Sequence, residues 1–245
     1  MEACKNCERE LTGAYCAACG QKASTQRMGW AWLAHELQHT LFHVDKGLLF
    51  TLKELFTRPG RSIREFLEGH RVRHFKPFAT VIITATVYSL LYRLMRPTLN
   101  GITLNKDMAQ LMELWNQWMG QYYAFLELAM LPLFALCTWV VMRKYGHNYV
   151  EHLVIQAYIA AQRIVVSIVF LPLNLLGTAG VMLSGSILWV AYTAGFILTL
   201  AQLYNDRPAE RVVLRAFVAL LLFFSTLMVI LTAAGVAYIA LQHGH

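Results

Sequence analysis

The feature that most constrains this chain is a set of long apolar segments in its last two thirds. Each is close to the roughly 20 residues that a helix needs to cross about 30 Å of hydrocarbon. Lipid offers the backbone no hydrogen-bond partners, so such segments form α-helices, which satisfy their own N–H and C=O groups. The sequence therefore predicts an all-α integral membrane protein with about five transmembrane helices. The predicted spans are residues 78–95, 122–142, 152–173, 181–204 and 212–241.

Composition and charge point the same way. The chain of 245 residues is 57% hydrophobic and only 14% charged, whereas soluble domains average about 25% charged residues. The net charge is +7, and 12 of the 21 Lys and Arg residues precede residue 78. Membrane proteins concentrate Lys and Arg in their cytoplasmic segments. We therefore interpret the basic excess before residue 78 as a sign that this part of the chain faces the cytoplasm. We expect a multi-pass protein with a cytoplasmic N-terminus and no nucleic-acid partner.

Ahead of the spans, the sequence divides into a cysteine-bearing head at residues 1–23 and a basic region at residues 24–77, with the membrane domain at 78–245. At 100° per residue, the basic region places apolar side chains on one side of three successive short helices. We call this region the collar. The stripes are Trp30, Leu33, Leu37, Leu41 and Val44; Leu48, Leu49, Leu52, Leu55 and Phe56; and Ile63, Phe66 and Leu67.

The third collar helix carries its own end signals. Ser62 and Glu65 form an S-x-x-E pattern that predicts a capping box, and Gly69 is placed to end the helix. A further apolar stripe with two tryptophans covers residues 108–119 on the far side of the first span. Such amphipathic helices suit the lipid surface, although packing against the spans explains the same stripes.

The most specific motif lies in the head. Two C-x-x-C pairs, Cys4/Cys7 and Cys16/Cys19, are separated by eight residues. Each pair puts two sulfurs on one tight turn, and four thiolates form the tetrahedral set of a structural zinc site. Disulfides are disfavoured in a cytosolic head, while iron would use the same ligands. We expect a zinc ribbon with structural Zn²⁺, because four sulfurs leave no open position for catalysis.

A second metal-like pattern runs from His35 through Glu36 to His39 and spells the H-E-x-x-H of zinc proteases. His43 is eight residues from His35, about 12 Å along a helix, so one ion cannot be held by both. No third ligand stands at a familiar spacing. We therefore interpret the three histidines as a solvated helix face. The alternatives are a metalloenzyme at the membrane surface and a pH-sensing face.

Polar residues inside the spans are functional candidates, because charge at that depth is costly. Arg163 lies in the middle of the third span beside Gln162, and Glu127 in the second span is the nearest intramembrane acid. The Arg–Glu pair would line a polar path, bind an anionic headgroup or fix helix packing.

A basic junction stands immediately before the first span. It would hold anionic lipid headgroups, and the ordinary positive-inside anchor is the simpler interpretation. Its cations are Arg71, Arg73 and Lys76.

The head and residues 45–78 together resemble an uncharacterised bacterial membrane-protein family, the domain of unknown function numbered 3667. The resemblance rests on the double C-x-x-C head followed by DKGLLFTLKELFTRPGRSIREFLEGHRVRHFKPF, and it covers about residues 1–95. It implies a protein of the bacterial inner membrane and supplies no activity. The positions that carry it are Cys4, Cys7, Cys16, Cys19, Asp45, Gly47, Thr51, Leu52, Pro59, Gly60, Gly69, Arg71, Lys76 and Pro77.

The polar residues within the spans favour permeation or transport of a small solute or ion, with the collar as a gate or docking surface. The alternative is a non-transporting scaffold whose ribbon recruits a cytosolic protein partner. Ala191 and Gly195 give the fourth span a small-residue face for close packing within the bundle or in a homo-oligomer. Membrane lipids with anionic headgroups are the remaining expected partners.

Overall fold

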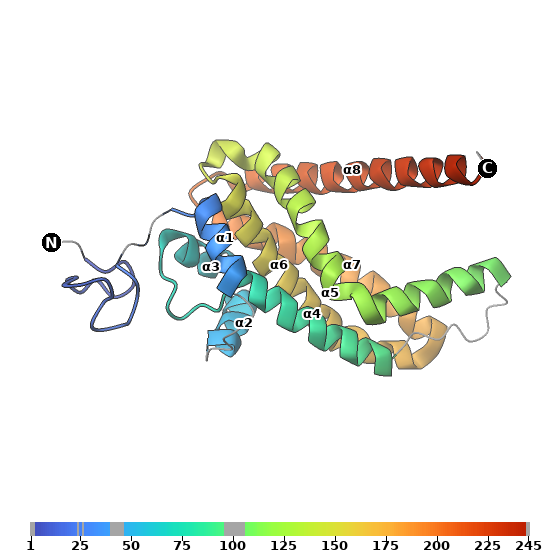
Figure 1. Cartoon of the computed structure of the whole chain (residues 1–245), viewed down its shortest axis with the longest axis horizontal. Coiled ribbons are helices and arrows are strands. Elements are labelled where there is room, and N and C mark those ends of the chain that lie inside the picture. The colour runs from blue at the N-terminus through green and yellow to red at the C-terminus, as the bar shows by residue number, and fades with distance from the viewer. Residues whose placement is uncertain (1–2, 24, 26, 40–46, 96–105, 244–245) are drawn as a thin grey trace.

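The computed structural model describes residues 3–23, 25, 27–39, 47–95 and 106–243, and this part of the chain is helical without a named strand (Figure 1). Two isolated β-bridges, Ala3 with Glu10 and Tyr15 with Lys22, lie in the head. The elements are α1 (Trp30–His39), α2 (Gly47–Thr57), α3 (Pro59–Glu68), α4 (Pro77–Leu94), α5 (Lys106–Met142), η1 (Arg143–Tyr145), α6 (Tyr149–Phe170), η2 (Leu171–Leu176), α7 (Gly177–Leu203) and α8 (Ala209–His243).

The described residues contain four stretches that are long and apolar enough to cross a membrane: 77–94, 113–145, 149–203 and 209–236. The third is 55 residues long, far more than one crossing needs. It consists of α6 and α7, which pack against each other, and the short 3₁₀ turn η2 between them. Figure 1 shows the chain turning back there, at the end opposite the head. The prediction of an all-α membrane protein with about five spans is confirmed.

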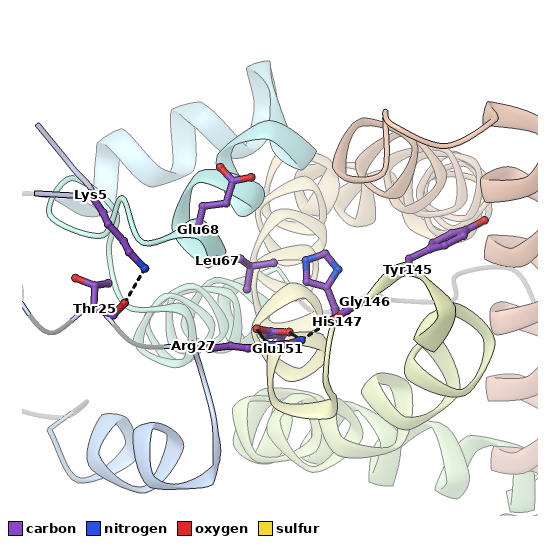
Figure 2. A pocket seen from close by; sticks show the side chains of 9 residues that line it. All are labelled: Lys5, Thr25, Arg27, Leu67, Glu68, Tyr145, Gly146, His147 and Glu151. Carbon is purple, nitrogen blue, oxygen red and sulfur yellow. Dashed lines mark hydrogen bonds and ion pairs between the residues drawn. The ribbon is translucent and has the colours of Figure 1, made fainter. Parts of the chain in front are cut away.

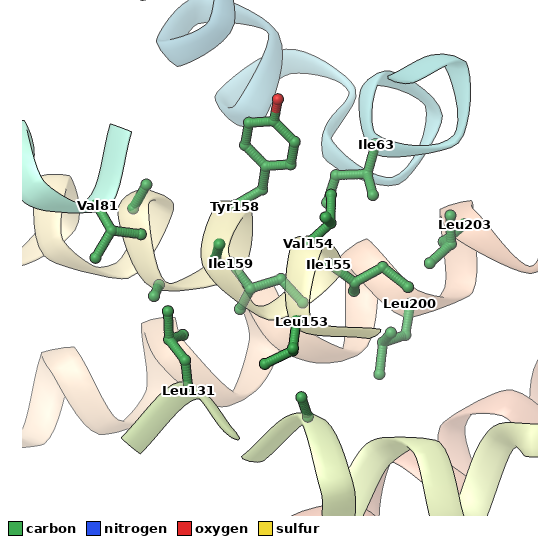
Figure 3. Packing of buried hydrophobic residues seen from close by; sticks show 14 of the residues in the cluster. Ile63, Val81, Leu131, Leu153, Val154, Ile155, Tyr158, Ile159, Leu200 and Leu203 are labelled. Atoms are coloured by element: carbon green, nitrogen blue, oxygen red, sulfur yellow. The ribbon is translucent and has the colours of Figure 1, made fainter. Parts of the chain in front are cut away.

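Helix α6 is the centre of the bundle. It packs against α2, α4, α5 and α7. From Val150 to Ala161 its side chains point in several directions and all are buried, as expected for a helix surrounded by other helices (Figure 3). The helix begins at a capping box, in which Asn148 accepts from the Glu151 N–H and the Glu151 carboxylate accepts from the Asn148 N–H.

Helix α3 packs against the end of α7. Proline at its first position fixes the start of the helix. Gly60 follows, and a Cβ built there would lie 2.3 Å from the Leu203 nitrogen and the Thr199 carbonyl oxygen. Only glycine permits so close an approach. The Gly60 N–H donates to the Gln202 side chain at 3.2 Å, and the Arg64 guanidinium donates to the last carbonyls of α7.

The sequence predicted both ends of α3, and the structure confirms one of the two predictions. Gly69 ends the helix in the left-handed conformation, with φ 118°, as predicted. The capping box predicted at Ser62 and Glu65 is wrong, because the helix already begins at Pro59. The Ser62 hydroxyl instead lies 3.0 Å from His74 Nε2, and the Glu65 carboxylate pairs with Arg58 at 2.9 Å.

The other collar helices bury faces that the apolar stripes describe only in part. Helix α2 buries Thr51 and Glu54 as well as Leu55, while Leu49 and Phe56 remain exposed. The Phe75 N–H donates to the Thr51 hydroxyl at 2.7 Å, which ties α2 to the segment before α4. The predicted stripe residues Leu41 and Val44 lie outside the described residues.

The stripe at residues 108–119 does not form a separate surface helix. It is the first part of α5, which continues unbroken from Lys106 to Met142. Trp115 is 61% exposed and Trp118 is 50% exposed. This exposure fits a position at the membrane interface, where tryptophan is favoured.

Candidate functional site

The four head cysteines converge as their spacing predicts. All four sulfurs lie within 4.8 Å of one another. Cys4 Sγ is 3.6 Å from Cys19 Sγ, and Cys7 Sγ is 3.5 Å from Cys16 Sγ. A tetrahedral ion with metal–sulfur bonds of about 2.3 Å requires sulfur separations of about 3.8 Å, whereas a disulfide requires about 2.05 Å. The arrangement therefore fits a metal ion held by four thiolates.

The two C-x-x-C turns are built alike. The N–H of Glu8 donates to the Cys4 carbonyl at 2.8 Å, and the N–H of Gly20 donates to the Cys16 carbonyl at 2.9 Å. Glu8 and Gly20 both have positive φ, 61° and 75°. Hydrogen bonds from the Cys19 and Ala18 N–H groups lower the pKa of Cys16 to about 6.

The segment after the cysteines fastens the head to the rest of the protein. Arg27 makes a two-pronged ion pair with the Glu151 carboxylate at 2.8 and 2.9 Å. The Asn148 side-chain amide donates to the Met28 carbonyl at 2.8 Å. The Gln21 side chain accepts from the Arg71 N–H at 3.2 Å. The cysteine-bearing head is therefore fixed to the start of α6 and to the junction before α4.

A polar pocket lies where the head meets the membrane domain, and we call it the head pocket (Figure 2). Its volume is about 320 Å³. Lys5 lines it from the head, Thr25 from the segment after the head, and Glu68 from the end of α3. Tyr145 and His147 line it from the connection between α5 and α6. Burial lowers the pKa of His147 below its usual 6.5, so this ring favours its neutral form.

A second, larger cavity lies within the membrane domain between α5, α6, α7 and α8. Its volume is about 580 Å³ and most of its lining is apolar. Trp115, Trp189 and Leu231 line it and are each more than half exposed, so the cavity opens on the flank of the bundle. We call it the intramembrane cavity.

The structure brings the predicted pair Arg163 and Glu127 together on the wall of this cavity. The Arg163 guanidinium donates to the Glu127 carboxylate, and its central carbon lies 5.8 Å from the Tyr192 ring centre. The Glu127 side chain is 11% exposed and the Arg163 side chain 31%, so the guanidinium is the more accessible member. Gln162 also lines the cavity, but it donates to the Leu55 carbonyl of α2 at 2.8 Å.

The three cations of the basic junction have different surroundings. The Arg71 guanidinium lies 5.7 Å from the ring centres of both Trp32 and Phe66. Burial lowers the pKa of Arg71. Lys76 is half-buried directly before α4, and Arg73 is exposed. Arg71 therefore packs within the protein, and Arg73 is the most open of the three to a headgroup.

The H-E-x-x-H pattern is described only in part. His35 is exposed and Glu36 is buried, so these neighbours point in different directions from α1. The side chain of His39 and all of His43 lie outside the described residues. Within the described part of the chain, three or more metal-ligating side chains come close enough to hold one ion only at the head cysteines.

A comparison with protein families matches residues 45–89 of the chain to DUF3667, a protein family of unknown function. The match covers α2, α3 and the first part of α4. It therefore includes the start of α3 at Pro59 and Gly60. No curated protein and no solved structure matches the chain.

Proposed function

We propose that this protein binds an amphiphilic molecule in the intramembrane cavity and transports it between the two leaflets. The observation that carries the proposal is a cavity of about 580 Å³ whose wall holds the Arg163–Glu127 pair. Ligand sites are typically 300–1,000 Å³, mostly apolar, with a few polar groups that fix orientation. An ionised pair inside a membrane domain is costly and marks substrate paths more often than inert packing.

The shape of the cavity favours an amphiphile over a free ion. The exposed rim at Trp115, Trp189 and Leu231 gives an apolar molecule a way in from the flank. The guanidinium and carboxylate offer a donor and an acceptor to a small polar head, while its apolar part remains against the aromatic and aliphatic walls. An aqueous ion path would instead require polar groups along its length.

The proposed setting is the bacterial inner membrane with the head in the cytoplasm. Arg143, Lys144, Arg207 and Arg211 are exposed in the two turns at the head end of the bundle. They add positive charge to the end that already carries the basic collar, which supports a cytoplasmic location by the positive-inside rule. We further propose that the ion held by the cysteines is structural Zn²⁺, since four sulfurs complete its coordination.

The test uses vesicles of phosphatidylcholine that contain the purified protein and a fluorescent short-chain phospholipid. Dithionite quenches the fluorophore in the outer leaflet, so quenching of the remainder reports transfer between leaflets. The informative variant is Gly195→Leu, because a Cβ at Gly195 meets only the Gln162 side chain, at 3.9 Å, and the longer side chain would fill the cavity.

Wild type should transfer the probe, and Gly195→Leu should reduce the rate at least tenfold. The matched control is Gly185→Leu in the same helix, where a Cβ meets no atom within 4 Å and which does not line the cavity. It should behave as wild type. Absence of transfer by wild type, or equal rates in the two leucine variants, would contradict the proposal.

The charged pair is tested by replacing both members at once. Removal of one partner leaves a buried charge unpaired and costs about 3–5 kcal/mol, whereas an apolar pair of similar size is often neutral. Arg163→Met combined with Glu127→Met should therefore fold and yet lose transfer. If this double variant transfers the probe at the wild-type rate, the pair fixes helix packing and takes no part in recognition.

A further inference from the structure

Buried polar atoms without a hydrogen-bond partner gather at the head end of the membrane domain. Six side-chain atoms of this kind lie together in this one region of the described protein. Buried polar groups in folded proteins are nearly always hydrogen-bonded, so such a group of exceptions indicates a bound polar species. The six are Tyr145 OH, His147 Nδ1, His152 Nε2, Gln156 Oε1, Tyr204 OH and Arg215 Nη1.

These residues form one continuous row. The Arg215 guanidinium lies 4.5 Å from the Tyr145 ring centre, and the Tyr145 and Tyr204 rings are 4.9 Å apart. The ring of His147 is 5.4 Å from that of Tyr204 and 6.3 Å from that of His152. Tyr145 lies in η1, His147 in the loop before α6, and His152 and Gln156 in α6. Tyr204 directly follows α7, and Arg215 lies near the start of α8.

Thr138 of α5 determines which atoms of the row can accept a proton. Its hydroxyl donates to the Phe134 or the Ala135 carbonyl, each 3.1 Å away. When it does so, its oxygen accepts from the Gln156 amide at 3.3 Å and from His152, 3.2 Å away, in the tautomer that carries its proton on Nδ1. With Nδ1 protonated, His152 Nε2 presents a lone pair. Gln156 Oε1 presents a second acceptor one helical turn along.

The row joins the two cavities. Tyr145 and His147 line the head pocket, where Figure 2 shows the His147 ring directed toward its interior. Gln156, at the other end of the row, lines the intramembrane cavity. His152 stands between them and is fully buried. A polar connection thus runs from the head end of the bundle to the cavity that holds Arg163 and Glu127.

The charged groups around the row come from every neighbouring element. Glu151 and its partner Arg27 lie beside His147, and Arg64 of α3 and Asp206 also act on that ring. Arg207 lies 5.6 Å from the Tyr145 ring centre. The nearby acids Glu151 and Asp206 are each in an ion pair with an arginine. Arg215, at the far end of the row, is itself a cation, so the neutral rings of His147 and His152 are the groups of the row that can accept an additional proton.

We propose that the row from Tyr145 to Gln156 is a hydrated path that delivers protons from the head pocket to the intramembrane cavity. A hydronium ion in the path gives its proton to His152 Nε2, where one N–H bond forms and the ring becomes an imidazolium. That bond breaks again when the proton passes to the water beside Gln156. The ring ends neutral, and no other reactant is needed.

The test places a reporter at the cavity end of the path. In Gln156→Glu, a buried carboxylic acid replaces the amide, and its C=O infrared band shifts when the acid proton exchanges for deuterium. In protein reconstituted in nanodiscs, exchange should finish within seconds of transfer to D₂O. Adding His152→Phe should slow it at least tenfold, whereas adding His35→Phe on exposed α1 should not. Equal rates with and without His152→Phe, or no exchange over minutes, would overturn the proposal.

A second variant decides the matter if the acid disrupts folding. Tyr204→Phe removes only the hydroxyl that lacks a partner within the described protein. If a path water binds this hydroxyl, the variant should have a lower Tm than wild type. A higher Tm would show a dry, unpaired hydroxyl and overturn the proposal. Tyr15→Phe, at an exposed position of the head, is the control and should leave the Tm unchanged.

The inference rests on the proposed function only for the role of the cavity. Deuterium exchange is read without any amphiphile, so the two proposals fail separately. Fast exchange without lipid transfer would contradict the transport proposal alone. Intact lipid transfer with exchange that His152→Phe leaves unchanged would contradict the proton path alone.

Discussion

Substituting Gly60 with alanine should separate α3 from α7. The added Cβ would lie 2.3 Å from two backbone atoms of α7, whereas ordinary contact begins at 3.4 Å. The helices would therefore have to move apart by about 1.1 Å. Such a shift lengthens the 3.2 Å bond from the Gly60 N–H to Gln202 and loosens the Arg64 contacts with the α7 carbonyls. Overpacking of this kind costs about 1–3 kcal/mol.

The assay is thermal unfolding of the purified protein in detergent. For a chain of this size, 1 kcal/mol shifts the Tm by about 2–4 °C, so Gly60→Ala should lower it by about 2–12 °C. Gly29→Ala is the control, because a Cβ there meets no atom within 4 Å. An unchanged Tm for Gly60→Ala would refute the close docking of α3 on α7, and with it the structural role assigned to the family-matched segment.

Three further results are expected. Burial lowers the pKa of His74 below 6.5, so the unfolded state binds the proton more readily; the Tm should fall as the pH drops below about 6.5, and His74→Gln should weaken that fall. Elemental analysis should find one zinc per chain, lost in Cys16→Ser and kept in His35→Ala; two zinc ions, one lost with His35, would revive the metalloenzyme interpretation. Arg27→Gln removes the ion-pair partner of the nearly buried Glu151 carboxylate, so protease cleavage between the head and α1 should be faster than in the Arg9→Gln control; equal cleavage would contradict the docking of the head.

The parts of the structure that the sequence predicts are those decided by local composition. Apolar length specifies the spans, because lipid leaves the backbone no alternative to a helix. The double C-x-x-C spacing is enough to bring four sulfurs together, because each pair occupies one short turn. The Arg163–Glu127 pair follows from the scarcity of intramembrane charge, since each ion needs a partner.

The parts that sequence reasoning missed depend on tertiary contacts. The stripe of α3 indicates a buried face, but only the fold reveals that Gly60 meets the backbone of α7. Ser62 carries a capping pattern, and competition from His74 and from Pro59 at the helix start overrides it. Helix α5 continues through Gly120 because one glycine costs only about 1 kcal/mol in a helix.

The sequence does carry one signal of the polar row. His152 and Gln156 are four residues apart at the start of the span that also holds Gln162 and Arg163, so they share one helix face. That spacing could have marked them as intramembrane polar candidates beside Gln162. Their connection to Tyr204 and Arg215 could not be predicted, because it requires the ends of α7 and α8 to meet the loop before α6.

The most direct test of the central claim is native mass spectrometry of the protein purified from its membrane. If the intramembrane cavity holds an amphiphile, wild type and Gly185→Leu should carry an added mass in the range of a lipid. Gly195→Leu, which fills the cavity, should lose it. The same added mass on all three proteins, or none on wild type, would contradict the account.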